Sequence, residues 1–124
     1  MSLEFLHSDK APAAVGPYSQ GTKGGSVVFV SGQLPIKDGE LQEDVKKATQ
    51  ASLENVLAVV EAAGGKLEDI ARVGVFVDDI NDFGAINDVY TEFFGDHKPA
   101  RALVEVAALP KGAVVEIEAT AIVG

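Results

Sequence analysis

The sequence predicts an α+β domain in which a mixed sheet of five or six strands carries two helices on one face. Three observations support this prediction. Two segments space their apolar residues as helices do, the other apolar segments alternate as strands do, and the segments follow the order β-β-β-α-β-α-β-β. A chain of 124 residues can bury a core without disulfides or metal, so we expect a single domain over 1–124.

The first half is predicted to hold strands and loops. A short strand near 4–7 precedes the segment APAAVGPYSQG, whose prolines and glycines indicate an ordered irregular loop. The segment SVVFVSGQLP follows as a strand that ends at Gly32 and Pro35. GTKGG at 21–25 lacks the spacing of a phosphate-binding loop and is expected to be a hairpin turn, and KDGE is expected to be another turn.

Two helices follow from apolar spacing and end signals. The first is predicted from about Glu43 to Ala63, because apolar residues recur at i, i+3, i+4 and i+7 from Leu53 and glycines follow it. After a strand in DIARVGVFVDDI, Asn81 or Asp82 can cap the second helix. The apolar and aromatic residues at helical spacing on this second helix are Phe83, Ile86, Tyr90, Phe93 and Phe94.

The last two strands, ARALVEVAAL and AVVEIEATAIV, are expected to form a hairpin across the turn PKG. If Ala108 pairs with Ala113, then Arg101 and Glu118 become diagonal neighbours on one face, about 7–8 Å apart. A slip of one residue would move them to different faces.

Two interpretations of Arg101 and Glu118 stay open. They could form a structural ion pair, or the arginine could bind a small carboxylate beside a glutamate that handles a water or a proton.

The same register places Glu105 opposite Glu116, which would be repulsive. At least one of these two glutamates then needs a cation or a backbone donor elsewhere.

Composition narrows the classes of partner. With 19 acidic against 10 basic residues, the formal charge of −9 disfavours nucleic acid and anionic lipid. The absence of cysteine excludes a disulfide framework and thiolate chemistry. No secretory signal or membrane-spanning run is present in this sequence, so the expected location is the cytoplasm. His7 and His97 are expected at the surface or in loops, outside any metal site.

Several predicted strands are apolar on both faces, but two helices can cover only one face of the sheet. The second face is therefore expected to pack on copies of the same chain. A closed homo-oligomer follows from this expectation.

Four blocks of sequence resemble the reactive intermediate deaminase family, also called Rid or YjgF-like: GPYSQ at 16–20, VSGQLP at 30–35, NDVYTEFF at 87–94 and PARALVEVAALPKGAVVEIEATA at 99–121. The resemblance covers essentially the whole chain. It implies a chorismate-mutase-like (YjgF-like) fold, assembled as a homotrimer around a barrel of sheets with clefts between subunits. It also implies hydrolysis of enamine and imine acids, such as 2-iminobutanoate and 2-iminopropanoate, that pyridoxal-phosphate dehydratases release. The products would be a 2-oxo acid and ammonia, and no metal or organic cofactor would be required.

The resemblance also implies roles for individual residues. Arg101 would bind the substrate carboxylate, and Glu118 would position the attacking water and carry protons. Arg101 and Glu118 could come from one subunit and Tyr18 or Asn87 from the next. Some family members have Cys or Thr where this chain has Leu103, so only the backbone could serve there. The further residues expected to line the pocket are Tyr18, Ser31, Gly32, Asn87 and Leu103.

Other interpretations remain for the residues and for the function. Tyr18 could simply pack its ring under a loop, and Ser31 is not expected to be a nucleophile because neither histidine stands in a matching motif. The chain could bind a 2-oxo acid as a regulatory module without turnover. Endoribonuclease and translation-inhibitor activities have been ascribed to relatives, but the acidic balance argues against them here.

Overall fold

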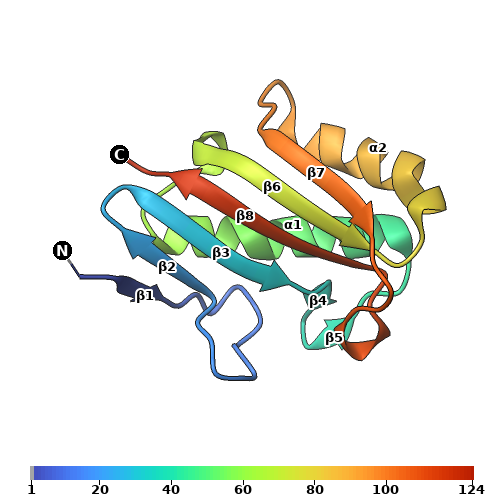
Figure 1. Cartoon of the computed structure of the whole chain (residues 1–124), viewed down its shortest axis with the longest axis horizontal. Helices are drawn as coiled ribbons and strands as arrows, with labels where there is room; N and C mark the ends of the chain where they lie inside the picture. Colours follow the sequence, from blue (N-terminus) through green and yellow to red (C-terminus); the bar gives the residue numbers. More distant parts are fainter. Residues whose placement is uncertain (1) are drawn as a thin grey trace.

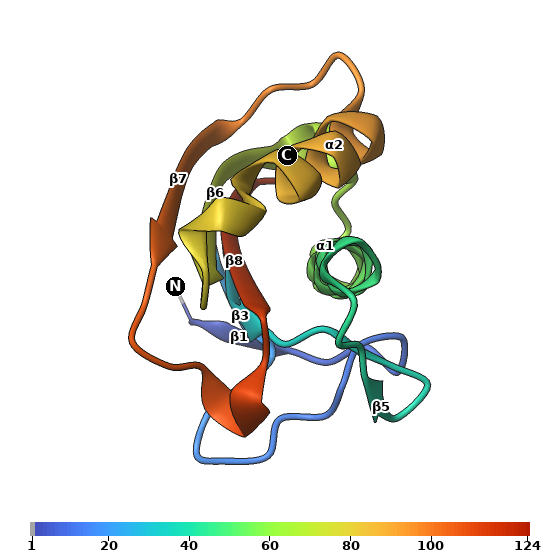
Figure 2. The ribbon, with the colours of Figure 1, turned by 90° about the vertical axis from the view of Figure 1, so that its right-hand side faces the viewer.

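The computed structural model describes residues 2–124 and contains one six-stranded sheet with two helices on one face (Figures 1 and 2). The predicted α+β class, with a mixed sheet and both helices on one side, is confirmed. Across the sheet the strand order is β1-β2-β3-β8-β6-β7. The strands are β1 (Glu4–Leu6), β2 (Gly21–Gly24), β3 (Val27–Gln33), β6 (Ile70–Val77), β7 (Ala100–Glu105) and β8 (Val115–Ile122).

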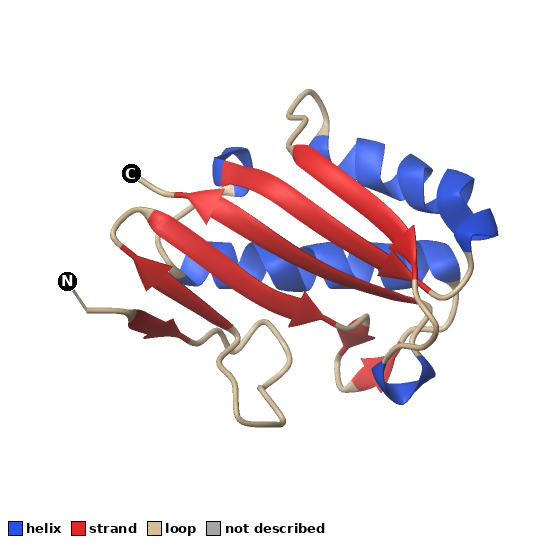
Figure 3. Ribbon diagram, in the orientation of Figure 1, coloured by secondary structure: helices blue, strands red, loops and turns tan. Residues whose placement is uncertain are grey.

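A separate two-stranded hairpin, β4 (Ile36–Lys37) and β5 (Glu40–Leu41), forms around the predicted KDGE turn (Figure 3). Helix α1 (Val45–Ala62) lies within the predicted range and is capped by Asp44, whose Oδ2 accepts a hydrogen bond from the backbone N–H of Lys47 at 3.1 Å. Its buried face includes Leu53, Val56, Val59 and Val60, which form the core with the inner side of the sheet.

Helix α2 (Phe83–Phe94) begins after Asp82, as predicted, although the Asp82 side chain makes no capping hydrogen bond. The side chain of Asp79 caps the short 3-10 turn Ile80–Asp82 that precedes the helix, and there it accepts from the backbone N–H of Asn81 at 2.9 Å. The helix ends at Gly95, whose φ of 61° suits glycine. Helix α2 therefore connects β6 to β7, and these two strands run parallel.

The prediction that 21–25 is only a turn is wrong. Residues Gly21–Gly24 form β2, which pairs antiparallel with β1 and β3, and the turn is confined to Gly25 and Ser26. A Cβ on Gly21 would lie 2.7 Å from Cγ1 of Val59, so glycine here permits close packing of the sheet on α1.

The predicted C-terminal hairpin and its register are also wrong. Strand β7 lies at the edge and pairs with β6, whereas β8 lies between β3 and β6 and is antiparallel to both. Arg101 aligns with Val73, which is buried under the helices, whereas Glu118 aligns with the next residue, Gly74. Arg101 and Glu118 consequently lie on opposite faces of the sheet.

Glu105 and Glu116 are not opposed either, because Glu105 aligns with Val77 and Glu116 with Phe76. Glu105 Oε1 accepts from the backbone N–H of Ile80 at 2.9 Å. The predicted repulsive pair is therefore wrong, although Glu105 does accept from a backbone donor.

The face of the sheet opposite the helices is uncovered, which is visible edge-on in Figure 2. We call it the open face. Several large apolar side chains on it are exposed: Phe5 (72%), Phe29 (54%), Val104 (44%) and Ile122 (49%). Exposed apolar surface of this kind commonly marks a contact with another molecule. The homo-oligomer predicted from the sequence stays a prediction. Within residues 2–124, neither helix has the length and hydropathy to cross a membrane.

Candidate active site

Arg101 projects from the edge strand β7 toward α2, on the helix side of the sheet. Its Nη1 donates to Oδ1 of Asn87 at 2.7 Å, and its guanidinium carbon lies 4.6 Å from the ring centroid of Tyr90. In residues 2–124 the ion pairs are His7–Asp9 and Lys46–Asp88, so Arg101 has no carboxylate partner there. The interpretation of Arg101 and Glu118 as an ion pair within one chain is therefore wrong.

The surroundings of Arg101 suit a small anion. A cavity of about 270 Å³ beside it is lined by residues of α2, of the following loop and of β7, including Lys98. None of the described residues that line this cavity is Asp or Glu. Guanidinium has five N–H donors in a planar fork, and Asn87 is its only hydrogen-bond partner in the described chain. The remaining donors are free for a carboxylate.

Leu103 lies two residues after Arg101 and therefore on the same face of β7. Its side chain is half-buried and packs against the core. The structure thus brings Arg101, Asn87 and Leu103 together at the β7 edge, and we call these three residues the arginine half-site.

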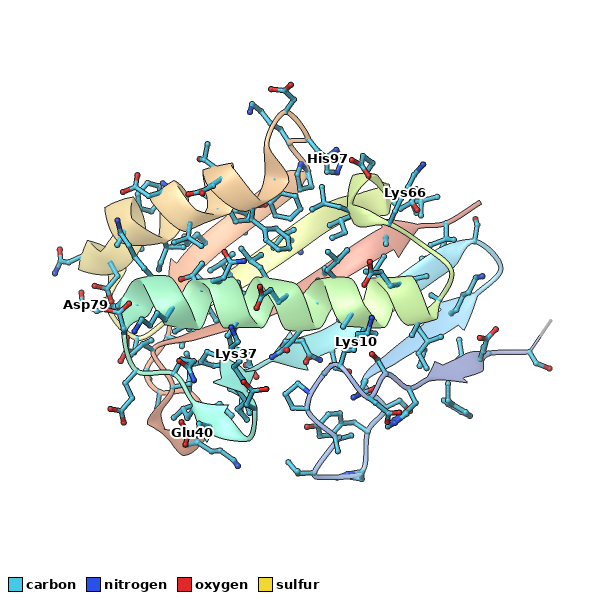
Figure 4. All side chains as sticks on the ribbon, turned by 180° about the vertical axis from the view of Figure 1, so that it is seen from behind. Lys10, Lys37, Glu40, Lys66, Asp79 and His97 are labelled. Carbon is cyan, nitrogen blue, oxygen red and sulfur yellow. The ribbon has the colours of Figure 1, made fainter. Side chains whose placement is uncertain are left out.

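A second group of predicted residues gathers where the loop after β1 meets the end of β3. Tyr18 is about half exposed, and it shares a cavity of about 600 Å³ with Gly32. Figure 4 views the molecule from the helix side and labels Lys10 and Lys37, which also line this cavity. The hydroxyl of Ser31 donates to the backbone carbonyl of Ser19 at 2.6 Å. This bond joins the loop to β3, and no histidine contacts the hydroxyl in the described chain.

Two carboxylates on the open face extend this second group. A register shift in β3 between Val30 and Gln33 places Gly32 against β8, where an added Cβ would lie 2.9 Å from Cδ and Oε2 of Glu116. Glu118 packs over Gly74 in a similar way. A Cβ added to Gly74 would lie 3.1 Å from Cγ of Glu118, the nearest atom.

The two carboxylates also differ in their electrostatics. Burial raises the pKa of Glu116, and the negative charge of Glu118 raises this pKa further. We call Tyr18, Ser31, Gly32, Glu116 and Glu118 the carboxylate half-site.

Glu116 and Tyr90 were not among the residues predicted for the site. Strand alternation puts Glu116 on the same face as Glu118, but its contact with Gly32 depends on the irregularity in β3, which has no sequence signal. Tyr90 follows Asn87 by three residues, so helical spacing could have placed it beside Arg101 once the pairing of β7 was known.

Neither histidine belongs to either half-site as defined, although His97 also lines the cavity beside Arg101. Nε2 of His7 lies 2.8 Å from Oδ1 of Asp9, and Nε2 of His97 lies 2.7 Å from the backbone carbonyl of Ile70. Among residues 2–124, no three His, Asp or Glu side chains are grouped so that they could hold a metal ion.

Comparison with known proteins identifies the family. The model of the family described as Endoribonuclease L-PSP matches residues 8–123. The chain belongs to this family. A member from Salmonella typhimurium strain LT2, named 2-iminobutanoate/2-iminopropanoate deaminase, is 52% identical over 122 residues, covering 94% of this chain and 95% of the relative.

Solved members of the family share the fold. The crystal structure of Escherichia coli TdcF with bound serine has a TM-score of 0.94 at 46% identity and covers 98% of this chain and 99% of that chain. The crystal structure of the YjgF gene product of Escherichia coli has a TM-score of 0.93 at 47% identity, with 96% and 98% covered. The resemblance to reactive intermediate deaminases is therefore confirmed.

Proposed function

We propose that this chain hydrolyses 2-imino acids, such as 2-iminobutanoate and 2-iminopropanoate, to 2-oxo acids and ammonia. The observation that carries the proposal is Arg101, a guanidinium oriented by Asn87 and free of any carboxylate partner in the described chain. Full-length relatives at about half identity are named for this reaction, and similarity at that level extends over nearly the whole chain.

The arginine half-site would bind the substrate. A 2-imino acid carries its carboxylate beside the reactive C=N carbon, and the free guanidinium donors of Arg101 can bind that carboxylate in a bidentate manner. Binding of this kind fixes the position of the imine carbon relative to the attacking water. The backbone of Leu103 would border the bound substrate on the same face of β7.

The carboxylate half-site would handle water and protons. Water adds to the imine carbon, one of its protons passes to a carboxylate, and the resulting carboxylic acid returns this proton to the nitrogen. The carbinolamine then passes its hydroxyl proton through the same carboxylate to the nitrogen, and the C–N bond breaks as C=O forms and ammonia leaves. Glu118 was expected in this role, but the raised pKa of Glu116 and its contact with Gly32 favour Glu116 as the proton carrier. Glu118 would then tune that pKa, and Tyr18 and Ser31 would shape the pocket.

Arg101 and the two carboxylates, Glu116 and Glu118, lie on opposite faces of the sheet, so one chain alone cannot join them around a small substrate. A second copy could place its open face against the β7 edge of the first. We therefore propose a homotrimer in which each site takes Arg101 and Asn87 from one subunit and the carboxylates, with Tyr18, from its neighbour. The exposed apolar side chains of the open face support such packing.

A coupled assay tests the activity. A pyridoxal-phosphate threonine dehydratase would generate 2-iminobutanoate, and 2-oxobutanoate release would be followed with and without this protein. We expect acceleration by the wild type and none by Arg101→Ala, with Arg101→Lys as the charge-preserving control. No acceleration by the wild type would reject the proposed activity.

Binding of a 2-oxo acid without turnover is the second candidate, because the free donors of Arg101 would bind a carboxylate whether or not a reaction follows. Calorimetry with 2-oxobutanoate separates the two. Binding by a protein that does not accelerate imine hydrolysis would favour a regulatory module.

RNA left intact by the purified protein would exclude a ribonuclease, which the excess of 19 acidic over 10 basic residues already disfavours.

A further inference from the structure

One face of α2 is built around Arg101. Phe83, Asn87, Tyr90 and Phe94 recur at i, i+4, i+7 and i+11, which aligns them along one side of the helix. Asn87 accepts from the guanidinium, and the centroids of Tyr90 and Phe83 lie 4.6 Å and 5.8 Å from its central carbon. The hydrogen bond holds one N–H in place, and the nearer ring borders the guanidinium at cation–π distance.

The ring of Tyr90 is itself held in place. Its centroid lies 4.7 Å from that of Phe94, and Phe94 is 5% exposed and belongs to the core. A ring with this support cannot turn away from the guanidinium without disturbing the core. Arg101, at the exposed edge of the sheet, is thereby linked to the rigid interior of the molecule.

The hydroxyl of Tyr90 does not explain why a tyrosine stands here. It is buried and has no hydrogen-bond partner among the described residues. Burial raises the pKa of Tyr90 and the positive charge of Arg101 opposes this, so the phenol stays neutral near pH 7 and carries no charge to attract Arg101. The aromatic face remains as the feature that acts on Arg101.

We propose that Tyr90 is a positioning residue for carboxylate recognition: its ring supports the guanidinium of Arg101 so that the donors not used by Asn87 point toward the substrate carboxylate. The inference rests on the proposed deaminase function. It adds a residue of the cavity wall whose effect on substrate binding is exerted through Arg101. Its effect should fall on substrate binding, with little effect on the rate of the bound complex.

Three variants separate ring support from general packing. Tyr90→Leu removes the aromatic face, Tyr90→Phe keeps it and removes the hydroxyl, and Phe93→Leu is the matched control. Phe93 is one of the aromatic residues of α2 and packs on Phe94 at 5.2 Å, but no cation–π contact joins it to Arg101. The two leucine variants should therefore lose similar stability in thermal unfolding.

The readouts are KM and kcat for 2-iminobutanoate and, separately, the Kd for 2-oxobutanoate by calorimetry. We expect Tyr90→Leu to raise KM and Kd about tenfold with little change in kcat, because a partly desolvated cation–π contact is lost. Tyr90→Phe should stay within about twofold of wild type, as should Phe93→Leu. Equal effects of the two leucine variants, or no effect of Tyr90→Leu, would overturn the inference.

A second measurement avoids any loss of folding. Fluorinated phenylalanines at position 90 keep the shape of the ring and progressively weaken its negative face, so Kd should rise with each added fluorine. If Kd stays the same along the series, the inference is also overturned. If the wild type binds 2-oxobutanoate without turnover, the deaminase proposal fails while Kd still tests Tyr90. If it neither binds nor turns over, both proposals fail.

Discussion

At the scale of single residues, the candidate site depends on a guanidinium that has N–H donors without a hydrogen-bond partner in the described chain. Arg101 forms one hydrogen bond, to Asn87, and no ion pair within the described chain. An arginine in a structural salt bridge would have its charge compensated by a carboxylate. The uncompensated charge of Arg101, in a protein of formal charge −9, favours recognition of an anionic ligand over a structural role.

Replacing Asn87 tests how Arg101 is oriented. Asn87→Ala removes a hydrogen bond to a charged group, so kcat/KM should fall by about tenfold or more, equivalent to ~1.5–3 kcal/mol. Asn87→Asp is the informative partner variant, because a carboxylate there would pair with Arg101 and compete with the substrate. Steady-state kinetics should therefore show a larger rise in KM for Asn87→Asp than for Asn87→Ala. The reverse order would contradict this account of Arg101.

The pH dependence of the reaction tests the two carboxylates. Burial and the charge of Glu118 raise the pKa of Glu116, and an ionised Glu116 is required to accept a proton from water. Activity should therefore fall as the pH decreases through this raised pKa. Glu118→Gln removes the neighbouring charge, so the acidic limb of kcat/KM should move to lower pH, whereas Glu116→Gln should abolish activity. If the acidic limb of kcat/KM stays at the same pH in Glu118→Gln, Glu116 is not the titrating group.

The same pKa shift has a consequence for stability. Because the pKa of Glu116 is higher in the folded state than in the unfolded state, the folded state binds the proton more tightly. This contribution to stability is fully present below the unfolded pKa and is lost as the pH rises through the folded pKa. The ionised form needed for catalysis is therefore the one that the fold disfavours, which is common at active sites.

At the scale of elements, a strand irregularity positions the carboxylate half-site. The register shift in β3 brings Gly32 against the side chain of Glu116, leaving no room for a Cβ. Strand irregularities often serve to re-aim side chains beside active sites. The geometry of Glu116 thus depends on a glycine in a neighbouring strand.

Gly32→Ala tests this dependence. The new methyl group would displace the Glu116 carboxylate, and kcat should fall by about 10- to 100-fold, as expected for a catalytic group moved by about 1 Å. The accompanying loss of stability should be only ~1–3 kcal/mol. Gly84→Ala is the control, because nothing lies within 4 Å of its added Cβ and alanine in α2 should stabilise by up to about 1 kcal/mol. Kinetics and thermal unfolding of both variants check the prediction, and a normal kcat in Gly32→Ala would contradict it.

Local patterns predicted the helices well, because apolar spacing and the glycines that follow are properties of neighbouring residues. The pairing of β7 and β8 could not be predicted in this way. Alternation shows that Arg101 and Leu103 share one face of their strand and that Glu116 and Glu118 share one face of theirs. Whether these two strand faces lie on the same side of the sheet depends on how β7 and β8 each pair with β6, and such pairing is a long-range contact. The residue types of the site were therefore accessible from the sequence, but their division into two half-sites was not.

At the scale of the whole molecule, the sheet itself separates Arg101 from the two carboxylates. Arg101 faces the helices and the carboxylates face the uncovered side, so the sheet lies between them. Figure 2 shows why the second face is available: both helices lie on the other one. An assembly that covers the open face would bury its exposed apolar side chains and bring the two half-sites together in a single step.

Mixing two inactive variants tests whether each site is shared between two subunits. Arg101→Ala and Glu116→Gln should each be inactive alone, and sedimentation should show the same oligomer for both. When equal amounts are unfolded and refolded together, random assembly should restore about a quarter of wild-type activity, because one interface in four then joins two intact half-sites. A mixture as inactive as its components, although the oligomers have exchanged subunits, would contradict a site shared between two copies of the chain.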